Sequence, residues 1–168
     1  VERALGPHDG CRLNFQNENK SLHLFDSFEG LSVRTNWDSS RSSMNEEQKK
    51  KERRYFAVDV SVVEENLREF SFVRIHKGWI PERFIDVEDQ TFCFVHLDVD
   101  LYQPMLDSLE FFSPRLSIGG AIVVDDYGHG DFAGAKAAVD QFMKNSGRFF
   151  KYEVPMGGAI LFNLGEGR

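Results

Sequence analysis

Short apolar runs alternate with segments of helical periodicity along this chain, and no other feature restricts the fold as strongly. Strands are predicted at 22–25, 72–75, 92–97 and 121–124, and helices at 62–70, 102–112 and 133–143. Strands that alternate with helices form parallel sheets with right-handed crossovers. Two closing strands, 149–154 and 159–164, are joined by a short Gly-rich link that favours a hairpin. We therefore expect an α/β fold with a mostly parallel sheet and a C-terminal antiparallel hairpin.

Length and charge limit the possible partners. The 168 residues fit one domain, 1–168, and 20 Lys+Arg against 27 Asp+Glu give a net charge of −7. Nucleic acids and anionic membranes favour a basic surface, so neither is expected as the main partner. No apolar run approaches the ~20 residues that span a bilayer. No signal peptide opens the chain, so a cytoplasmic protein is expected.

The segment 39–54 is the least structured by its composition. A run of Ser and Arg leads into a block with five positive and three negative charges between Glu46 and Arg54. Such a block is typical of a solvated loop or a frayed helix, and we expect a flexible charged loop over 39–54. A basic lid over an acidic site is the alternative interpretation.

Acidic residues follow several of the predicted strands, at the edge where ligands bind in parallel α/β sheets. Asp26 ends the first strand, Asp98 and Asp100 follow the strand at 92–97, and Asp125 and Asp126 follow the strand at 121–124. Carboxylates gathered at one edge repel one another and raise each other's pKa values. A hard divalent cation such as Mg²⁺ offsets this repulsion most simply. Asp98, Asp125 and Asp126 are the expected ligands, whereas the direction of Asp100 depends on where the chain turns.

Several residues keep two interpretations. Each of these Asp residues could instead cap the helix that follows it. His129 lies in a Gly-rich loop, where it could act as a base or remain in solvent, and Trp79 could stack on a flat ligand or join the core. His96 is expected as a packed core histidine. A metal-dependent phosphotransferase or hydrolase is disfavoured, because no phosphate-binding loop or nucleophile elbow is present.

Six motifs, in order, resemble those of the TylF/MycF (macrocin O-methyltransferase) family of S-adenosylmethionine-dependent enzymes, from about residue 22 to the end. The motifs are Phe25-Asp-Ser-Phe-Glu-Gly-Leu31, Lys77-Gly-Trp-Ile-Pro-Glu82, His96-Leu-Asp-Val-Asp-Leu-Tyr102, Pro114-Arg-Leu-Ser-Ile-Gly-Gly120, Val124-Asp-Asp-Tyr-Gly128 and Gly134-Ala-Lys-Ala-Ala-Val-Asp140. The resemblance implies a Rossmann-like class I methyltransferase sheet. It also implies methyl transfer to a hydroxyl of a sugar or other small natural product.

The resemblance also implies roles for individual residues. Asp98, Asp125 and Asp126 match metal-binding carboxylates, and His129 and Asp100 are the two candidates for the catalytic base. For S-adenosylmethionine, the resemblance implies Asp26 at the ribose hydroxyls and Gly78 and Trp79 near the adenine. Ser27 and Asp98 are the other residues expected to bind the cofactor. A bound cation would lower the pKa of the acceptor hydroxyl and orient it.

One departure from the family pattern has consequences. Family members carry a central strand and a Gly-rich turn before the strand that ends at Asp26, and residues 1–20 resemble neither. We therefore expect an N-terminally truncated domain that binds S-adenosylmethionine weakly or not at all. The alternative function is a non-catalytic protein of this fold that binds a metal or a partner. Two strand edges would lack neighbours, which favours direct pairing of 22–26 with 93–98 or association with another chain, including a homo-oligomer.

Overall fold

The computed structural model describes residues 20–41, 45–155 and 157–165. The strands are β1 (Leu22–Asp26), β2 (Val73–Lys77), β3 (Phe92–Leu97), β4 (Leu116–Val124), β5 (Phe149–Glu153) and β6 (Ala159–Asn163). The α-helices are α1 (Glu46–Tyr55), α2 (Val60–Leu67), α3 (Tyr102–Phe112) and α4 (Ala133–Lys144). Short 3₁₀ helices are η1 (Asn36–Arg41), η2 (Glu82–Val87), η3 (Ser113–Arg115) and η4 (Gly130–Phe132). Every predicted strand and helix is confirmed, with boundaries shifted by a few residues.

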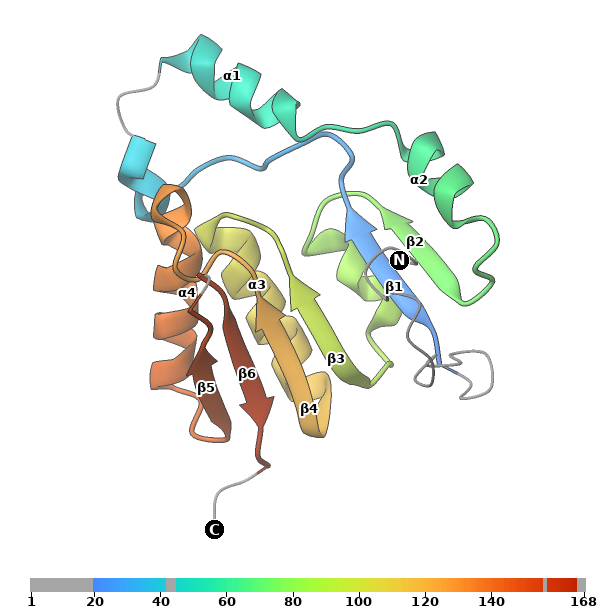
Figure 1. The fold of residues 1–168 in the computed structure, drawn as a ribbon, viewed down its shortest axis with the longest axis vertical. Helices are drawn as coiled ribbons and strands as arrows, with labels where there is room; N and C mark the ends of the chain where they lie inside the picture. The colour runs from blue at the N-terminus through green and yellow to red at the C-terminus, as the bar shows by residue number, and fades with distance from the viewer. Residues whose placement is uncertain (1–19, 42–44, 156, 166–168) are drawn as a thin grey trace.

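The strands form two hydrogen-bonded sheets in the described part of the chain (Figure 1). The first sheet pairs β1 with β2 in parallel, and the second has the order β3-β4-β6-β5. In the second sheet β3 and β4 are parallel, while β6 is antiparallel to both β4 and β5. The predicted C-terminal antiparallel hairpin is therefore confirmed.

The core lies between the larger sheet and the helices α3 and α4, which cover the same face (Figure 1). Val95 and Leu97 of β3 and Ile122 and Val124 of β4 are buried here. Each such side chain stabilises the fold by about 1.5–3 kcal/mol when fully buried. The longest described helix, α4, has 12 residues, so none of the described helices could cross a bilayer.

The opposite face of the larger sheet carries two rows of side chains from directly paired residues. One row is Phe94, Ala121, Phe162 and Phe150, and the other is His96, Val123, Ile160 and Tyr152. Phe94, Phe150 and Tyr152 are each more than half exposed. His96 is exposed on this face, so the expectation of a packed core histidine is wrong. The physical reason is that the described helices of this sheet pack on the other face.

No backbone pairing joins β1 to β3 among residues 20–41, 45–155 and 157–165, so the two predicted free edges do not close on each other. Aromatic packing connects the sheets instead. The ring of Phe25 on β1 lies 5.6 Å from that of Phe84 and 6.2 Å from that of Phe112 on α3. Phe112 in turn contacts Phe92 on β3, with ring centroids 5.1 Å apart.

Within the segment expected as a flexible charged loop, the residues from Glu46 onward form helix α1. Asn45 and Gln48 form a reciprocal capping box, in which each side chain accepts a hydrogen bond from the other residue's backbone N–H at 2.9 Å. The guanidinium of Arg34 makes a two-bond ion pair with Glu52, at 2.9 and 3.1 Å. The cap and this ion pair order the helix, although none of its residues is buried.

A histidine pair connects β1 to β2 on the side that faces η2. His23 Nδ1 lies 2.9 Å from His76 Nε2, and His76 Nδ1 lies 2.8 Å from the carboxylate of Asp86. Ser21 Oγ completes the array at His23 Nε2. Burial lowers the pKa of His23, and the nearby His76 and Arg74 lower it further. The folded chain therefore favours the neutral form of His23.

Acid should weaken this array. Because folding lowers the pKa of His23, its contribution to the free energy of unfolding is complete above about pH 6.5 and falls as the pH drops below that value. A His23→Gln variant should lose less stability between pH 7 and about pH 5. Urea unfolding at a series of pH values measures this slope. His129→Gln, at an exposed loop position, is the matched control, and equal slopes for the unaltered chain and the His23 variant would contradict the assignment.

Candidate functional site

The parallel register of β3 and β4 brings the ends of both strands together. Leu97 pairs with Val124 at the last position of the ladder. The N–H of Asp125 then donates to the carbonyl of Leu97 at 3.0 Å, which extends the pairing one step past the strands. Residues that follow these two strands are therefore held side by side at the carboxyl edge of the sheet.

Asp100 reaches this edge through a tight turn. The N–H of Leu101 donates to the carbonyl of Val99 at 2.5 Å, the bond of a γ-turn around Asp100. The φ angle of Asp100 is +60°, in the left-handed region that Asp and Asn tolerate better than most residues. The turn ends β3 before residue 100 and starts α3 at Tyr102.

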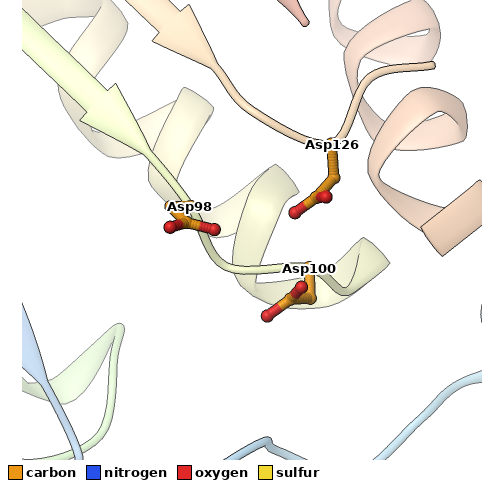
Figure 2. Close-up of side chains that lie close together, drawn as sticks. All are labelled: Asp98, Asp100 and Asp126. Carbon is orange, nitrogen blue, oxygen red and sulfur yellow. The ribbon is translucent and has the colours of Figure 1, made fainter. Parts of the chain in front are cut away.

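Three carboxylates converge in the resulting cluster, which we call the carboxylate cluster: Asp98, Asp100 and Asp126 (Figure 2). One oxygen from each lies within 4.8 Å of the others. Asp98 comes from the end of β3, Asp100 from the turn before α3, and Asp126 from the chain after β4. Asp125 is exposed and lies outside this geometric group. The structure thus brings together two of the three predicted metal ligands with one of the two predicted bases.

The pKa values of all three residues in the carboxylate cluster are raised. Burial raises the pKa of Asp100 to about 7, and the charges of Asp126 and Asp98 add to the rise. Burial also raises the pKa values of Asp98 and Asp126, followed by repulsion from Asp125 at the first and from Asp98 at the second. Asp125 is therefore within electrostatic range of the cluster even though its oxygens are not among the grouped atoms.

His129, the other predicted base, is exposed in the loop after Asp126. Its Nδ1 accepts the N–H of Asp131 at 3.4 Å, so the ring caps η4. Its charge would lower the pKa of Asp126, which places the ring within electrostatic range of the carboxylate cluster.

The residues predicted for the cofactor lie together at the ends of β1 and β2. The N–H of Gly78 donates to the carbonyl of Asp26 at 2.9 Å, and Trp79 follows half-buried. One oxygen of the Asp26 carboxylate accepts the N–H of Phe28 at 2.7 Å. Ser27 is buried, and its hydroxyl bonds within the loop to the Gly30 carbonyl and the Glu29 N–H. The Ser27 side chain thus serves the loop itself.

Two residues near the site have no signal in the sequence. Asp38 is only 2% exposed; one of its carboxylate oxygens accepts the N–H of Tyr102 at 2.8 Å, and the other accepts from Thr35. It caps α3 from 64 residues away. Arg34 binds Glu52 on α1, and its charge lowers the raised pKa of Asp100. Only the folded chain brings these residues to the site.

The donor set fits a hard divalent cation. Carboxylate oxygens are the ligands that Mg²⁺ prefers, and such a cation removes the repulsion that raises the three pKa values. Backbone hydrogen bonds at Asp125 and Leu101 hold the turns that present these oxygens. The arrangement can therefore hold a cation or, with no cation bound, a proton on Asp100 near neutral pH.

Removing one charge from the carboxylate cluster should stabilise the cation-free chain. Because folding raises the pKa of Asp100 from 3.8 to about 7, its contribution to stability falls as the pH rises across that range. Asp100→Asn keeps a residue that tolerates the positive φ. We expect a gain on the order of 1 kcal/mol at pH 8, limited by solvent screening, and a smaller gain at pH 5. Urea unfolding in a chelator measures it. Asp89→Asn, at an exposed site, is the control, and a gain independent of pH would contradict the explanation.

Comparison with known proteins gives a family and a fold. The macrocin-O-methyltransferase (TylF) family model matches residues 11–149. The 8-demethyl-8-(2,3-dimethoxy-alpha-L-rhamnosyl)-tetracenomycin-C 4'-O-methyltransferase of Streptomyces olivaceus is 38% identical over 55 residues, covering 33% of this chain and 21% of that protein. The demethyldecarbamoylnovobiocin O-methyltransferase of Streptomyces niveus is 32% identical over 75 residues, covering 42% of this chain and 29% of that protein.

Solved structures agree on the fold. The O-methyltransferase NovP superposes with a TM-score of 0.69 at 23% identity, covering 89% of this chain and 63% of that one. The calicheamicin methyltransferase CalS11 gives 0.66 at 19% identity, covering 87% and 61%. The chain thus spans less than two thirds of these relatives, and their likeness shows a methyltransferase fold. Because the family model covers most of the sequence, the chain belongs to the macrocin-O-methyltransferase (TylF) family.

Proposed function

We propose that this chain carries the metal-binding and proton-accepting part of an S-adenosylmethionine-dependent O-methyltransferase. The acceptor would be a hydroxyl of a sugar or another small natural product. The observation that carries the proposal is the carboxylate cluster, whose oxygens converge at the edge where α/β folds bind ligands. Family membership supports the reaction class, and the names of the two Streptomyces relatives support an acceptor of this kind.

The proposed cation ligands are Asp98, Asp125 and Asp126. Asp98 and Asp126 already lie in the carboxylate cluster, and the backbone of Asp125 is bonded to Leu97 beside them. Repulsion from Asp125 contributes to the raised pKa values of both. A cation bound here would supply Lewis acidity that lowers the pKa of an acceptor hydroxyl.

Asp100 is then the proposed general base. A general base must lie within hydrogen-bond reach of the proton that it takes, and a carboxylate oxygen of Asp100 converges with those of Asp98 and Asp126. The γ-turn fixes its carboxylate beside the proposed ligands, so an acceptor hydroxyl at the cation would lie within reach of it. His129 is the second candidate, supported by its place in the loop after Asp126.

The proposed cofactor contacts lie at the ends of β1 and β2. Asp26 keeps a carboxylate oxygen beyond its bond to Phe28, and a ribose offers hydroxyl donors to such an oxygen. Its charge also raises the pKa of Asp98, so the two candidate sites are within electrostatic range of each other. Trp79 offers an aromatic surface next to Gly78 for the adenine.

Cation affinity tests the ligand assignment. Titration calorimetry with Mn²⁺ should detect binding to the unaltered chain, and Asp98→Asn, Asp125→Asn and Asp126→Asn should each weaken it by about tenfold or more, because each removes a charged ligand. Asp89→Asn is the matched control. If Asp125→Asn left the affinity unchanged while Asp100→Asn abolished it, the third ligand would be Asp100 and the assignment of the base would fail.

Methyl transfer tests the function itself. With labelled S-adenosylmethionine, Mg²⁺ and a panel of rhamnosyl and other sugar hydroxyl acceptors, the protein that carries this chain should transfer label. Asp100→Asn should lower the rate by about 10²-fold or more because it removes the base, while leaving Mn²⁺ affinity within a few-fold. If neither the unaltered protein nor the Asp100→Asn variant transferred the labelled methyl group, while both still bound the cation, the non-catalytic alternative would be favoured.

A further inference from the structure

Tyr127 follows Asp126 directly, but its side chain is buried away from solvent. Asp126 contributes its carboxylate to the cluster at the sheet edge (Figure 2). Tyr127 is 3% exposed, and its phenol reaches residues of α4 and β5. Adjacent residues of one short loop therefore contact two different parts of the molecule.

Four charged side chains surround the Tyr127 hydroxyl. It donates to the carboxylate of Asp140 at 2.7 Å, with Glu153 at 3.1 Å. It accepts from the Nζ of Lys136 at 2.7 Å and from the Nζ of Lys151. The same two nitrogens lie 4.0 and 4.4 Å from the centroid of the tyrosine ring. The phenol is thus held by both its oxygen and its ring.

The surrounding charges balance one another. Although burial raises the pKa of Asp140, hydrogen bonds from Tyr127, Lys151 and Lys136 outweigh it and lower that pKa to about 2. Burial lowers the pKa of Lys151, but its bonds to Tyr127, Asp140 and Glu153 outweigh this and raise it. Two ammonium and two carboxylate groups therefore remain charged around the phenol at neutral pH, a charge-assisted network of the stronger kind.

A second contact holds the loop on its other side. The N–H of Gly128 donates to the carbonyl of Gly157, in the β5–β6 link, at 2.5 Å. A Cβ atom on Gly128 would lie 3.0 Å from the Cα of Gly157, so a side chain here would press on the backbone of the β5–β6 link. Together with the Tyr127 network, this contact leaves the loop little freedom to move away from the sheet.

Repulsion between carboxylates acts on this loop. Without a cation, one carboxylate oxygen of Asp126 lies within 4.8 Å of one of Asp98, and like charges at that distance push the loop after β4 away from β3. The phenol network pulls on the next residue and opposes that displacement.

We propose that Tyr127 is a positioning residue that keeps Asp126 in the carboxylate cluster so that a divalent cation meets a preformed site. The proposal rests on the cation site put forward above. Residues that hydrogen-bond to a metal ligand hold it in orientation. Removing such a residue typically lowers the affinity for the metal by about 10–100-fold. Tyr127 would act in the same way through the backbone.

The test compares Mn²⁺ affinity in Tyr127→Phe and Tyr152→Phe. Both remove one phenol hydroxyl, but Tyr152 is exposed on β5, whereas Tyr127 is buried and directly follows Asp126. By titration calorimetry we expect Tyr127→Phe to bind Mn²⁺ about tenfold more weakly, with Tyr152→Phe unchanged. The electron paramagnetic resonance spectrum of the bound Mn²⁺ should also change in the first variant, which a loss of stability alone would not cause. Circular dichroism establishes that each variant is folded.

Asp140→Asn provides a second route, because it weakens the network while leaving the tyrosine in place. It should lower Mn²⁺ affinity in the same direction by a smaller factor. Equal affinity and an unchanged spectrum in Tyr127→Phe would overturn the positioning role while the cation site stands. Absence of Mn²⁺ binding by the unaltered chain would overturn the cation site and this proposal with it.

Discussion

The register between β3 and β4 is the constraint on which the candidate site depends. Pairing Leu97 with Val124 buries four apolar side chains of these two strands against α3 and α4, at about 1.5–3 kcal/mol each. A slip of β3 by one residue would turn Val95 and Leu97 toward the opposite face. Repulsion between two carboxylates of the cluster is roughly 1 kcal/mol in bulk water and up to about 4 kcal/mol near a protein surface. Core packing therefore outweighs the repulsion and forces Asp98 and Asp126 together.

The same register explains how much of the site the sequence could predict. Apolar runs that end in acidic residues predict carboxylates at one sheet edge, because parallel strands end on the same side. That argument places Asp98 and Asp126 correctly. It stops at Asp100, whose direction depends on a γ-turn with positive φ, and at Asp125, where side-chain torsions decide which oxygens converge. Local sequence patterns predict neither the γ-turn at Asp100 nor the side-chain torsions at Asp125.

The order of α1 and the cap on α3 could not be predicted from the sequence for one shared reason. The order of α1 depends on the pairing of Arg34 with Glu52, and the cap on α3 depends on Asp38, which is 64 residues from Tyr102. Composition describes the residues around a position and is blind to such distant partners. Gly134 is the clearest example, because a Cβ atom at this position would lie 1.8 Å from a carboxylate oxygen of Asp38. The need for glycine at this position arises only from the packing of η1 against α4.

These distant contacts matter because the two sheets share no described backbone ladder. Asp26 stands on the β1–β2 sheet and Asp98 on the larger one, so strand register does not set the distance between them. The contacts that do are the rings of Phe25, Phe84 and Phe112, together with the segment from β1 to η1, whose Asp38 is bonded at the start of α3. Ring packing is less directional than a hydrogen-bonded ladder. Methyl transfer requires the donor and acceptor to be held in line within a fraction of an ångström. The buried Asp38 carboxylate, with its short bonds to Tyr102 and Thr35, is then the most directional connection between the candidate cofactor end and the carboxylate cluster among these contacts.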